Sequence, residues 1–388
     1  MRDGPLEIAF IAQDFPPNVG GTHVYNVEFA QRLHARGHVV KLLTWETQTP
    51  GVDEADASLP FPVERLRFER RHRGIEPRGV PEILGRWRAD VALVSGGSGA
   101  VSKIVRAAVD YLPVTVAVHD LRDKGSSRGR LGRWRVRRRY GFDRAARITA
   151  NSEHTRDRLI RLGVSAEKVA IVHPGVDTAR YAPDPAAGEG VRRELGLGGR
   201  PVLLTVARLA PNKGHGRVLE LLPRLREKLP DLVYVVVGGG GLRDALERRA
   251  EELGVREMVR FAGSVPDVRP YYNACDVFVM ASTPTAGGAK AGEGFGMAYV
   301  EAGACGKPVI ASTSGGGAEI VVDGETGLSV TATDDVGLER ALSELLTRPD
   351  WAQSLGEKAR QRVQRYDWSH GVDALEGVLR EAATAQAG

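Results

Sequence analysis

Short apolar runs that alternate with helical segments restrict most strongly how this chain can fold. Continuous runs rich in valine and isoleucine are typical of a parallel sheet covered by helices on both faces. The first 45 residues show the pattern: a run at Ile8–Ala12, apolar residues at helical spacing up to Gly37, and a second run at Val39–Leu43. Similar runs follow in the N-terminal half at Val91–Val94, Val114–Val118, Ile148–Ala150 and Val169–Val172.

The alternation stops and then begins again, which predicts two domains. Residues 174–185 lose the periodicity, and a second series of apolar runs and helical segments begins at Val202–Val206. A chain of 388 residues is long enough for two domains. We therefore expect an α/β protein with two doubly wound, Rossmann-like domains that face a cleft, over residues 1–180 and 185–365. Residues 366–388 carry no further strand, and we expect them to form a helix that crosses back to the first domain.

Hydropathy and cysteine usage indicate where such a protein works. The longest apolar runs, such as Leu232–Val237, are far shorter than the ~18–20 residues of a membrane span. No signal peptide is readable in the first 30 residues. The only cysteines, Cys275 and Cys305, lie in no CxxC motif or Cys/His cluster, which fits a reducing compartment and predicts no zinc site. We expect a soluble cytoplasmic protein.

The net charge of +5 is concentrated in the N-terminal half, much of it between Lys124 and Arg147. Nucleic acid, an anionic membrane surface or an acidic substrate would each explain such a stretch, and so would a solvated helix face. Leu131, Trp134 and Val136 make only a thin apolar stripe along it. We therefore favour a soluble, polar partner, keep a weak peripheral contact of Arg128–Arg139 with the inner face of a membrane as the alternative, and expect no nucleic acid.

The segment from Glu293 to Glu301, EGFGMAYVE, follows a glycine-rich stretch at Gly287–Gly292 and opens a helix. Glycines let backbone N–H groups approach a ligand, and a helix start offers unpaired donors, so we expect an anion such as a diphosphate there. Eight residues of helix would separate the two carboxylates by roughly 12 Å, more than the ~5–9.5 Å of glycosidase pairs. We interpret them as two separate hydroxyl acceptors; the alternative is a helix cap and a solvated glutamate.

Two basic residues, Arg208 and Lys213, follow the run at Val202–Val206. Open α/β sheets bind their ligands at the carboxyl ends of the strands. A guanidinium fork beside an ammonium group suits a diphosphate, although two basic residues on a loop can also be merely solvated.

The N-terminal half holds a similar pair of features. His119 follows the run at Val114–Val118, and Gly20 and Gly21 precede the first helix. The histidine would face the same cleft or serve a structural role, and the glycines would cradle a phosphate or simply form the turn.

Several binding motifs are absent from the sequence. No GxGxxG precedes the first helix and no Walker GxxxxGK[ST] occurs, while Gly238–Gly241 lacks the fingerprint spacing, so a nicotinamide cofactor is poorly supported. DxD and HExxH are also missing. The sequence therefore predicts neither a metal site nor a cofactor.

Together these features resemble the retaining glycosyltransferases of family 4, which have the GT-B fold. The resemblance covers nearly the whole chain. It is carried by the Gly20–Gly21 loop, FAQRLHARGHVV, the VHD at His119, ANSEHTRDRL, HPGVD, VARLAPNKG, FAGSVPD and the EX7E element of Glu293 and Glu301. The segment ASTPTAGGAKAGEGFGMAYVEAGACGKPVIASTSGGGAEIV, with its insertion before Glu293, is most similar to phosphatidylinositol-mannoside-type mannosyltransferases.

The resemblance implies a metal-independent enzyme that moves a hexose from a nucleotide diphosphate sugar to a hydroxyl of a polar small molecule or a lipid head group. GDP-mannose is the first donor it suggests, with UDP-glucose or UDP-N-acetylglucosamine next. A nucleotide-sugar epimerase or a sugar phosphorylase of the same fold is the alternative.

It also implies roles for individual residues. The catalytic group would be His119, Arg208, Lys213 and Glu293, with the two basic residues on the diphosphate, Glu293 on hexose hydroxyls and His119 facing the sugar. Further residues would bind the rest of the donor. Gly20 and Gly21 would lie near the phosphate, and Gly263, Ser264 and Val265 would contact the base. Glu301 would bind the ribose, and backbone N–H groups would come from Phe295, Gly296 and Met297. Asn212 departs from the family, whose members often carry a basic residue there.

Overall fold

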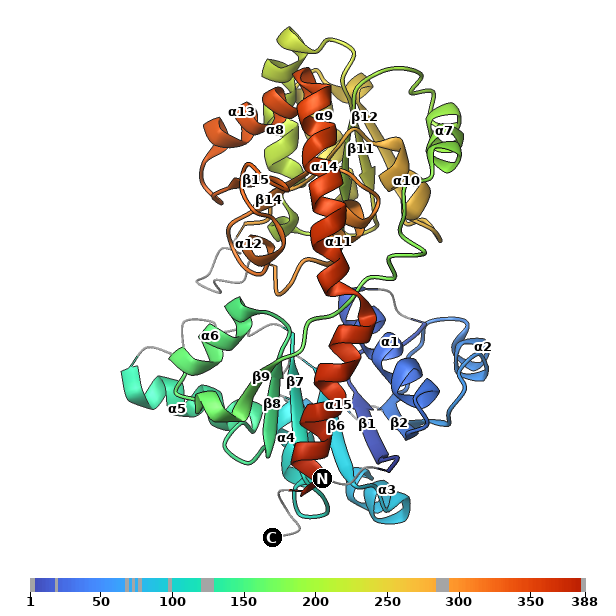
Figure 1. Ribbon diagram of the computed structural model, residues 1–388, viewed down its shortest axis with the longest axis vertical. Coiled ribbons are helices and arrows are strands. Elements are labelled where there is room, and N and C mark those ends of the chain that lie inside the picture. The colour runs from blue at the N-terminus through green and yellow to red at the C-terminus, as the bar shows by residue number, and fades with distance from the viewer. Residues whose placement is uncertain are drawn as a thin grey trace. The chain divides into compact units, whose positions relative to one another are not determined.

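The computed structural model describes residues 4–17, 20–66, 70–71, 74–75, 79–96, 100–119, 129–283 and 293–384. These residues divide into two compact units (Figure 1). Unit 1 comprises the chain up to Pro174 together with the C-terminal segment from Trp368, and unit 2 comprises Gly175–Asp367. Lys124, Arg128 and the stretch Gly287–Gly292, which the sequence analysis singled out, lie outside the described residues.

Unit 1 is built on a parallel sheet with the strand order β3-β2-β1-β6-β7-β8-β9. Its central strands are short and completely buried, as in the VTVAV of β7, because both faces of the sheet are covered. The strands are β1 (Glu7–Ala12), β2 (Val39–Trp45), β3 (Val63–Leu66), β6 (Val91–Ser95), β7 (Val114–Val118), β8 (Arg147–Ala150) and β9 (Val169–Ile171), with a separate hairpin of β4 (Arg70–Arg71) and β5 (Gly74–Ile75).

The helices of unit 1 include one from the far end of the sequence. The C-terminal helix α15 buries Trp368, Leu375 and Leu379 and lies against α1 and strands β6 to β8 (Figure 1). The ring of Trp368 meets that of Phe29 edge to face, with centroids 5.3 Å apart. The helices are α1 (Gly21–Ala35), α2 (Val52–Ala57), α3 (Val80–Trp87), α4 (Ala100–Ala108), α5 (Gly129–Tyr140), α6 (Glu153–Arg161) and α15 (Trp368–Thr384).

Unit 2 has a second parallel sheet, with the strand order β12-β11-β10-β13-β14-β15. The strands are β10 (Val202–Val206), β11 (Val233–Val237), β12 (Val259–Gly263), β13 (Val277–Met280), β14 (Val309–Ser312) and β15 (Gly327–Val330). The helices are α7 (Pro185–Glu194), α8 (His215–Lys228), α9 (Arg243–Glu252), α10 (Arg269–Ala274), α11 (Met297–Ala304), α12 (Gly317–Ile320), α13 (Asp335–Thr347) and α14 (Pro349–Val363). The prediction of two Rossmann-like domains is confirmed.

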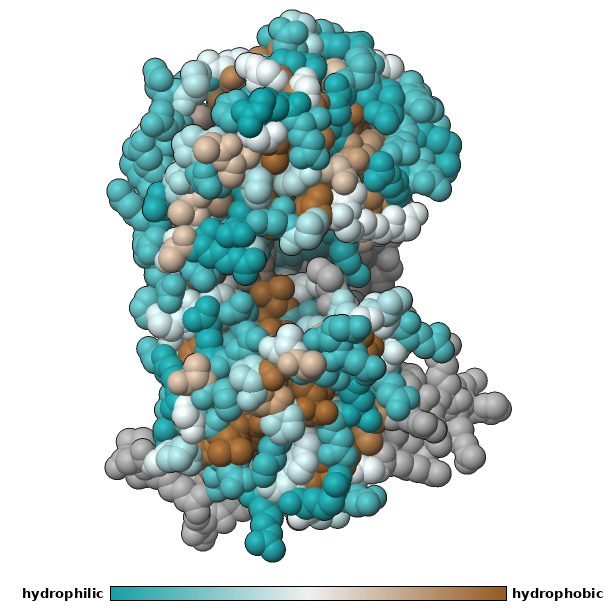
Figure 2. All heavy atoms as spheres, turned by 90° about the vertical axis from the view of Figure 1, so that its right-hand side faces the viewer, coloured by the Kyte–Doolittle hydropathy of each residue, from teal (hydrophilic) through white to brown (hydrophobic). Residues whose placement is uncertain are grey.

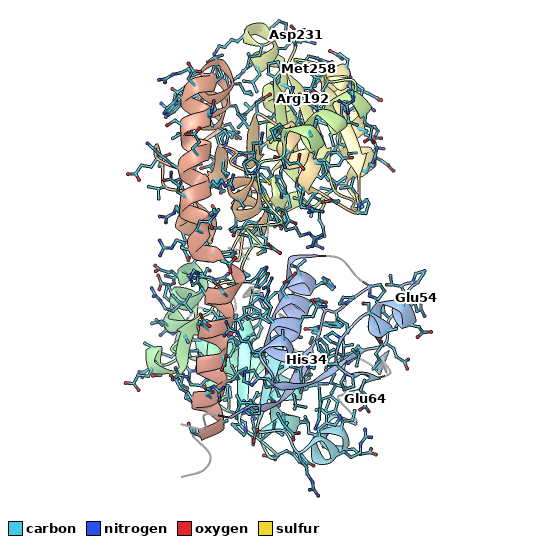
Figure 3. All side chains as sticks on the ribbon, turned by 45° about the vertical axis from the view of Figure 1, so that its right-hand side comes forward. His34, Glu54, Glu64, Arg192, Asp231 and Met258 are labelled. Carbon is cyan, nitrogen blue, oxygen red and sulfur yellow. The ribbon has the colours of Figure 1, made fainter. Side chains whose placement is uncertain are left out.

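Charged side chains fasten α7 to the sheet of unit 2. Arg192, which is labelled in Figure 3, donates from Nη2 to both carboxylate oxygens of Asp276 at 3.0 Å. The same carboxylate accepts the backbone N–H of Val202 at 2.7 Å, which lies at the start of β10. Because the Asp276 carboxylate accepts from both Arg192 of α7 and the backbone of β10, it links α7 to the amino end of the sheet of unit 2.

Hydrophilic side chains cover most of the face that Figure 2 shows, as expected for helices that turn their apolar side to a sheet. Within the described residues, none of the helices combines the length and the hydropathy needed to span a bilayer.

Candidate active site

An ion pair between Lys213 and Glu293 lies at the centre of the candidate site in unit 2. Lys213 Nζ donates to Glu293 Oε1 at 2.6 Å and to Oε2 at 2.9 Å. The Ser282 hydroxyl, which follows β13, donates to the same Oε1 at 2.7 Å. The two charged side chains are only 17% and 11% exposed, so the pair is held in a largely desolvated position where charge interactions are stronger than in water.

The backbone of Glu293 is fixed by the loop that follows β14. Its N–H donates to the carbonyl of Ser314 at 3.2 Å, and its carbonyl accepts the N–H of Gly316 at 2.9 Å. Gly315 has φ 108°, and a Cβ at this position would lie 2.1 Å from the Glu293 carbonyl oxygen. Only glycine therefore fits there, for both its φ and its close approach.

Helix α11 begins later than the sequence suggests. It covers Met297–Ala304, with Gly296 at its N-cap and φ 105°, so Glu293 lies four residues outside the helix. The expectation of eight helical residues between the two glutamates is therefore wrong, because the left-handed Gly296 and the pairing with Gly315 direct the chain away from the helix axis. The Tyr299 N–H donates to the carbonyl of Gly296 at 2.9 Å, whereas the N–H groups before it have no carbonyl one turn earlier in the helix, which makes this start of α11 suited to an anion.

Phe295, by contrast, turns its side chain into the core. It is 3% exposed, and its ring meets that of Tyr366 with centroids 5.4 Å apart. Only its backbone can therefore serve a ligand.

Glu301 lies inside α11 and is held by a tyrosine of α10. The hydroxyl of Tyr272 donates to Glu301 Oε2 at 2.7 Å, and Tyr272 is completely buried. Burial raises the pKa of the Glu301 carboxyl, and the hydrogen bond from Tyr272 opposes this shift. The carboxylate is thus fixed in one orientation with a single oxygen engaged by the tyrosine.

These groups meet at one edge of the unit 2 sheet because its strands are parallel and adjacent. The loops after β12, β11, β10, β13 and β14 all leave at the carboxyl ends of their strands, and we call this the carboxyl edge of unit 2. Arg208 is exposed in the loop after β10, and Gly263 ends β12 with φ 74°. Ser264 is exposed and Val265 is half-buried against the core.

Unit 1 has its own polar cluster, at the carboxyl ends of β6 and β7. His119 Nε2 lies 2.8 Å from the hydroxyl of Ser95, and that hydroxyl donates to Asn26 Oδ1 at 2.5 Å. The Tyr25 ring packs edge-on against the imidazole, with centroids 4.2 Å apart. Burial lowers the pKa of His119 to about 4, so its ring is neutral at ordinary pH.

The two predicted glycines lie at the start of α1 in the same unit. Gly20 is the N-cap and Gly21 the first helical residue. A Cβ at Gly21 would meet no heavy atom of the described residues within 4 Å, so packing does not explain why this residue is a glycine.

The comparisons with known proteins agree over most of the chain. The family described as Glycosyl transferases group 1 matches residues 189–362, and the one described as Glycosyltransferase Family 4 matches residues 19–180. The GDP-mannose-dependent alpha-(1-6)-phosphatidylinositol monomannoside mannosyltransferase of Mycolicibacterium smegmatis is 33% identical, over 92% of this chain and 94% of the relative. The chain belongs to the family-4 glycosyltransferases.

Other comparisons extend this result. A D-inositol 3-phosphate glycosyltransferase of Catenulispora acidiphila is 31% identical, over 97% of this chain and 95% of its own length. Among solved structures, the Anabaena protein HepE in complex with UDP superimposes with a TM-score of 0.82 at 22% identity, covering 97% of this chain and all of HepE. The lipopolysaccharide glycosyltransferase WaaG gives 0.73 at 20% identity, covering 96% of this chain and 99% of its own. These likenesses show the GT-B fold and give no support to an epimerase or phosphorylase.

Several side chains and turns that contact the candidate residues could not be singled out from the sequence. Ser282, Tyr272 and the Gly315–Gly316 turn hold the two glutamates, and Asn26 and Ser95 hold His119. The run of three glycines at 315–317 could have drawn attention, since such a run signals a close backbone approach. The others carry no pattern of their own in the sequence.

Proposed function

We propose that this glycosyltransferase moves a mannosyl residue from GDP-mannose to a hydroxyl of an acceptor that carries a phosphorylated inositol, with retention of the anomeric configuration. The names of two relatives support this choice: one includes GDP-mannose and phosphatidylinositol monomannoside, the other inositol 3-phosphate. Both acceptors have a phosphate on an inositol ring. UDP-glucose and UDP-N-acetylglucosamine are the next candidate donors.

The observation that carries the proposal is the gathering of positive groups at the carboxyl edge of unit 2. Arg208 and Lys213 follow the same strand, β10, and the start of α11 presents N–H groups and the positive end of its dipole. Breaking the anomeric C–O bond leaves negative charge on the departing diphosphate, and such donors are typically worth about 10²–10³-fold each in rate. Arg208 and the start of α11 match that charge, and Lys213, whose ammonium group pairs with Glu293, has a third N–H to donate.

We assign the rest of the donor to the neighbouring residues. Glu293, oriented by Lys213 and Ser282, accepts hydrogen bonds from hexose hydroxyls, with backbone donors from Phe295, Gly296 and Met297. Glu301 has one oxygen on Tyr272, and we assign the other to the ribose hydroxyls. The stretch Gly263–Val265 contacts the base. In unit 1, His119 contacts the sugar, and Gly20 and Gly21 approach a phosphate.

The transfer itself needs no carboxylate nucleophile. The acceptor hydroxyl attacks the anomeric carbon on the face that the diphosphate leaves, its new C–O bond forms as the bond to the phosphate oxygen breaks, and its proton passes to that oxygen. We further propose that no metal takes part, because the sequence lacks DxD and the described residues hold no group of three or more His, Cys, Asp or Glu side chains suited to a metal.

Helix α5 carries the basic stretch that could contact an acceptor or an anionic surface. Among its arginines, Arg130, Arg135, Arg138 and Arg139 are exposed, and Leu131 and Trp134 are 59% and 41% exposed. Val136, expected in an exposed stripe, is instead 4% exposed in the core, so the apolar surface is smaller than the sequence suggested. We propose that the enzyme recognises the polar head of its acceptor and that α5 adds a weak peripheral contact with an anionic surface.

A direct transfer assay tests this function. The enzyme is incubated with GDP-mannose, UDP-glucose or UDP-N-acetylglucosamine and with phosphatidylinositol monomannoside or inositol 3-phosphate, in excess EDTA, and the product is analysed by mass spectrometry and NMR. We expect an α-linked mannoside from GDP-mannose. Transfer from UDP sugars alone would overturn the donor assignment, a β-linkage would overturn retention, and a rate restored only by Mg²⁺ or Mn²⁺ would overturn metal independence.

A further inference from the structure

Four polar groups in unit 1 form a chain of hydrogen bonds that ends at His119. Asn26 Nδ2 donates to the backbone carbonyl of Asp14 at 2.7 Å. The Ser95 hydroxyl donates to Asn26 Oδ1 at 2.5 Å, and the same hydroxyl oxygen lies 2.8 Å from His119 Nε2. Asn26 and Ser95 are 0% and 1% exposed, so water does not compete for these contacts.

The direction of every bond in this chain follows from the first. A backbone carbonyl can only accept, so the amide nitrogen of Asn26 must face Asp14, and its oxygen must face Ser95. That oxygen also can only accept, so the single proton of the Ser95 hydroxyl is used there. The Ser95 oxygen is then left as an acceptor toward the ring, and His119 Nε2 must carry a proton and donate it.

The consequence for the ring is a single tautomer. A neutral imidazole holds one proton, and this proton is on Nε2, so Nδ1 carries a lone pair. Double protonation is opposed because burial lowers the pKa of His119 to about 4. The imidazole ring is also held in place by the ring of Tyr25. The backbone carbonyl of His119 accepts a hydrogen bond from Asn151 Nδ2 at 3.0 Å.

We propose that Asn26 and Ser95 are positioning residues that fix His119 as the Nε2–H tautomer, so that Nδ1 acts as a hydrogen-bond acceptor for a substrate hydroxyl. An acceptor nitrogen repels the oxygen atoms of a phosphate or carboxylate and selects a neutral O–H donor. His119 therefore binds a substrate hydroxyl through Nδ1, whereas the anionic groups of the substrates are bound by other residues. The assignment of that hydroxyl to a substrate rests on the proposed function.

The tautomer itself is tested without substrate. In protein labelled with ¹⁵N-histidine, long-range ¹H–¹⁵N correlation spectra at pH 7.5 report the state of each ring nitrogen, and the His119 signals are those that disappear in His119→Gln. We expect a protonated, pyrrole-type Nε2 and an unprotonated, pyridine-type Nδ1. A proton on Nδ1, or a mixture of tautomers in the wild type, would overturn the inference.

Two variants separate positioning from packing. Ser95→Ala removes the acceptor and is expected to give a mixture of tautomers, whereas Ser95→Thr keeps a hydroxyl and should restore the single form. Thr115→Val is the matched control, because Thr115 is 0% exposed on β7 and its hydroxyl has no hydrogen-bond partner among the described residues. It should leave the His119 spectrum unchanged; a shift as large as that of Ser95→Ala would mean that the spectrum reports packing alone.

A double-mutant cycle links the tautomer to transfer. Loss of one oriented hydrogen bond corresponds to roughly a tenfold change in rate, so Ser95→Ala should lower kcat/KM by about this factor in the wild type and have almost no effect in a His119→Ala background. Equal losses in both backgrounds would overturn positioning through His119. If the NMR result holds but His119→Ala transfers at the wild-type rate, the assigned role of His119 in substrate binding fails instead.

Discussion

Lys213 Nζ lies within 2.9 Å of both carboxylate oxygens of Glu293, a residue 80 positions further along the chain. The family resemblance implies that these side chains bind different parts of the donor, Lys213 the diphosphate and Glu293 the hexose. Their pairing makes them a single unit, in which each side chain orients the other. A substitution of one therefore changes what the other presents to a ligand.

The first prediction concerns the stability of this pair. Lys213→Met leaves the 11% exposed carboxylate of Glu293 without its cation, and we expect a loss of roughly 3 kcal/mol in the free energy of unfolding. The double variant Lys213→Met/Glu293→Gln should be more stable than Lys213→Met, because no unpaired charge remains. Urea denaturation of all three proteins measures this. A single variant as stable as the wild type would contradict it.

Arg208, in contrast to Lys213, is expected to contribute to turnover but not to stability. Its side chain is exposed and forms no hydrogen bond or ion pair with the described residues, so Arg208→Ala should change the free energy of unfolding by no more than about 0.5 kcal/mol. Turnover should nevertheless fall by about 10²–10³-fold if the guanidinium stabilises the leaving diphosphate. Arg248→Ala, another exposed arginine of unit 2, is the control for both measurements. Near wild-type turnover of Arg208→Ala would remove it from the site.

Gly315 is expected to be the most sensitive glycine near Glu293. In Gly315→Ala the new Cβ would lie 2.1 Å from the Glu293 carbonyl oxygen, so the turn must move and Glu293 with it. We expect a loss of several kcal/mol, beyond the ~1 kcal/mol that positive φ alone costs a non-glycine residue. Gly324→Ala is the matched control, because Gly324 has φ 73° and no heavy atom within 4 Å of the added Cβ. Equal melting temperatures for the two variants would contradict the crowding argument.

The comparison of sequence and structure explains why some of these features were predictable. The buried strands show directly in runs such as the VYVVV of β11, and parallel strands necessarily bring Arg208, Lys213 and Gly263 to one edge. The position of Glu293 was not predictable, because a left-handed Gly296 and contacts with a loop beyond β14 decide where α11 begins. Tertiary contacts of this kind override local helical spacing.

The same limit applies to side chains that support the functional residues. Tyr272, Ser282 and Ser95 lie near the ends of helices or strands, where hydroxyl residues are common and rarely informative. Their importance comes only from the strand order, which places them beside Glu301, Glu293 and His119. Val136 is an apolar residue whose exposure could not be predicted either. Its spacing in the sequence groups it with the exposed Leu131 and Trp134, but the side chain of Val136 is buried in the core.

A buried histidine should make unit 2 sensitive to acid. His215 is 2% exposed, both its ring nitrogens lack a hydrogen-bond partner among the described residues, and burial, with a smaller effect of Lys213, lowers its pKa to about 4. Between about pH 6.5 and pH 4 the unfolded chain binds this proton and the folded chain does not, so the free energy of unfolding falls as the pH is lowered.

The size of this effect can be isolated with one variant. His215→Leu removes the titrating group and should gain stability relative to the wild type as the pH falls, up to roughly 3 kcal/mol near pH 4. Urea denaturation at pH 7.5 and at pH 5 measures the difference between the two proteins at each pH. A difference that is the same at both pH values would show that His215 does not titrate in this range.

The last prediction concerns the basic face of α5. Arg130, Arg135 and Arg139 are exposed on this helix and are the residues to be changed. Arg138 is also exposed but stacks over Trp134, and Arg137 is engaged by Asp143 and the carbonyl of Leu162, so both are left unchanged. Each basic residue near an anionic bilayer contributes about 1 kcal/mol, so reversing three charges should abolish binding to vesicles that contain anionic lipid at low salt.

At physiological salt we expect only weak sedimentation of the wild type with such vesicles, because salt screens the attraction between the arginines and the anionic lipid. The apolar contribution is also small, since Leu131 and Trp134 are the only large apolar side chains exposed on the described part of α5. The triple variant Arg130→Glu/Arg135→Glu/Arg139→Glu should bind at neither salt concentration and should still transfer sugar to a water-soluble acceptor, since α5 carries none of the residues assigned to the donor. Three exposed arginines of unit 2, Arg193, Arg248 and Arg360, changed to glutamate give a control of equal charge. Strong wild-type binding at physiological salt that only the α5 variant loses would show that the membrane contact is a principal one.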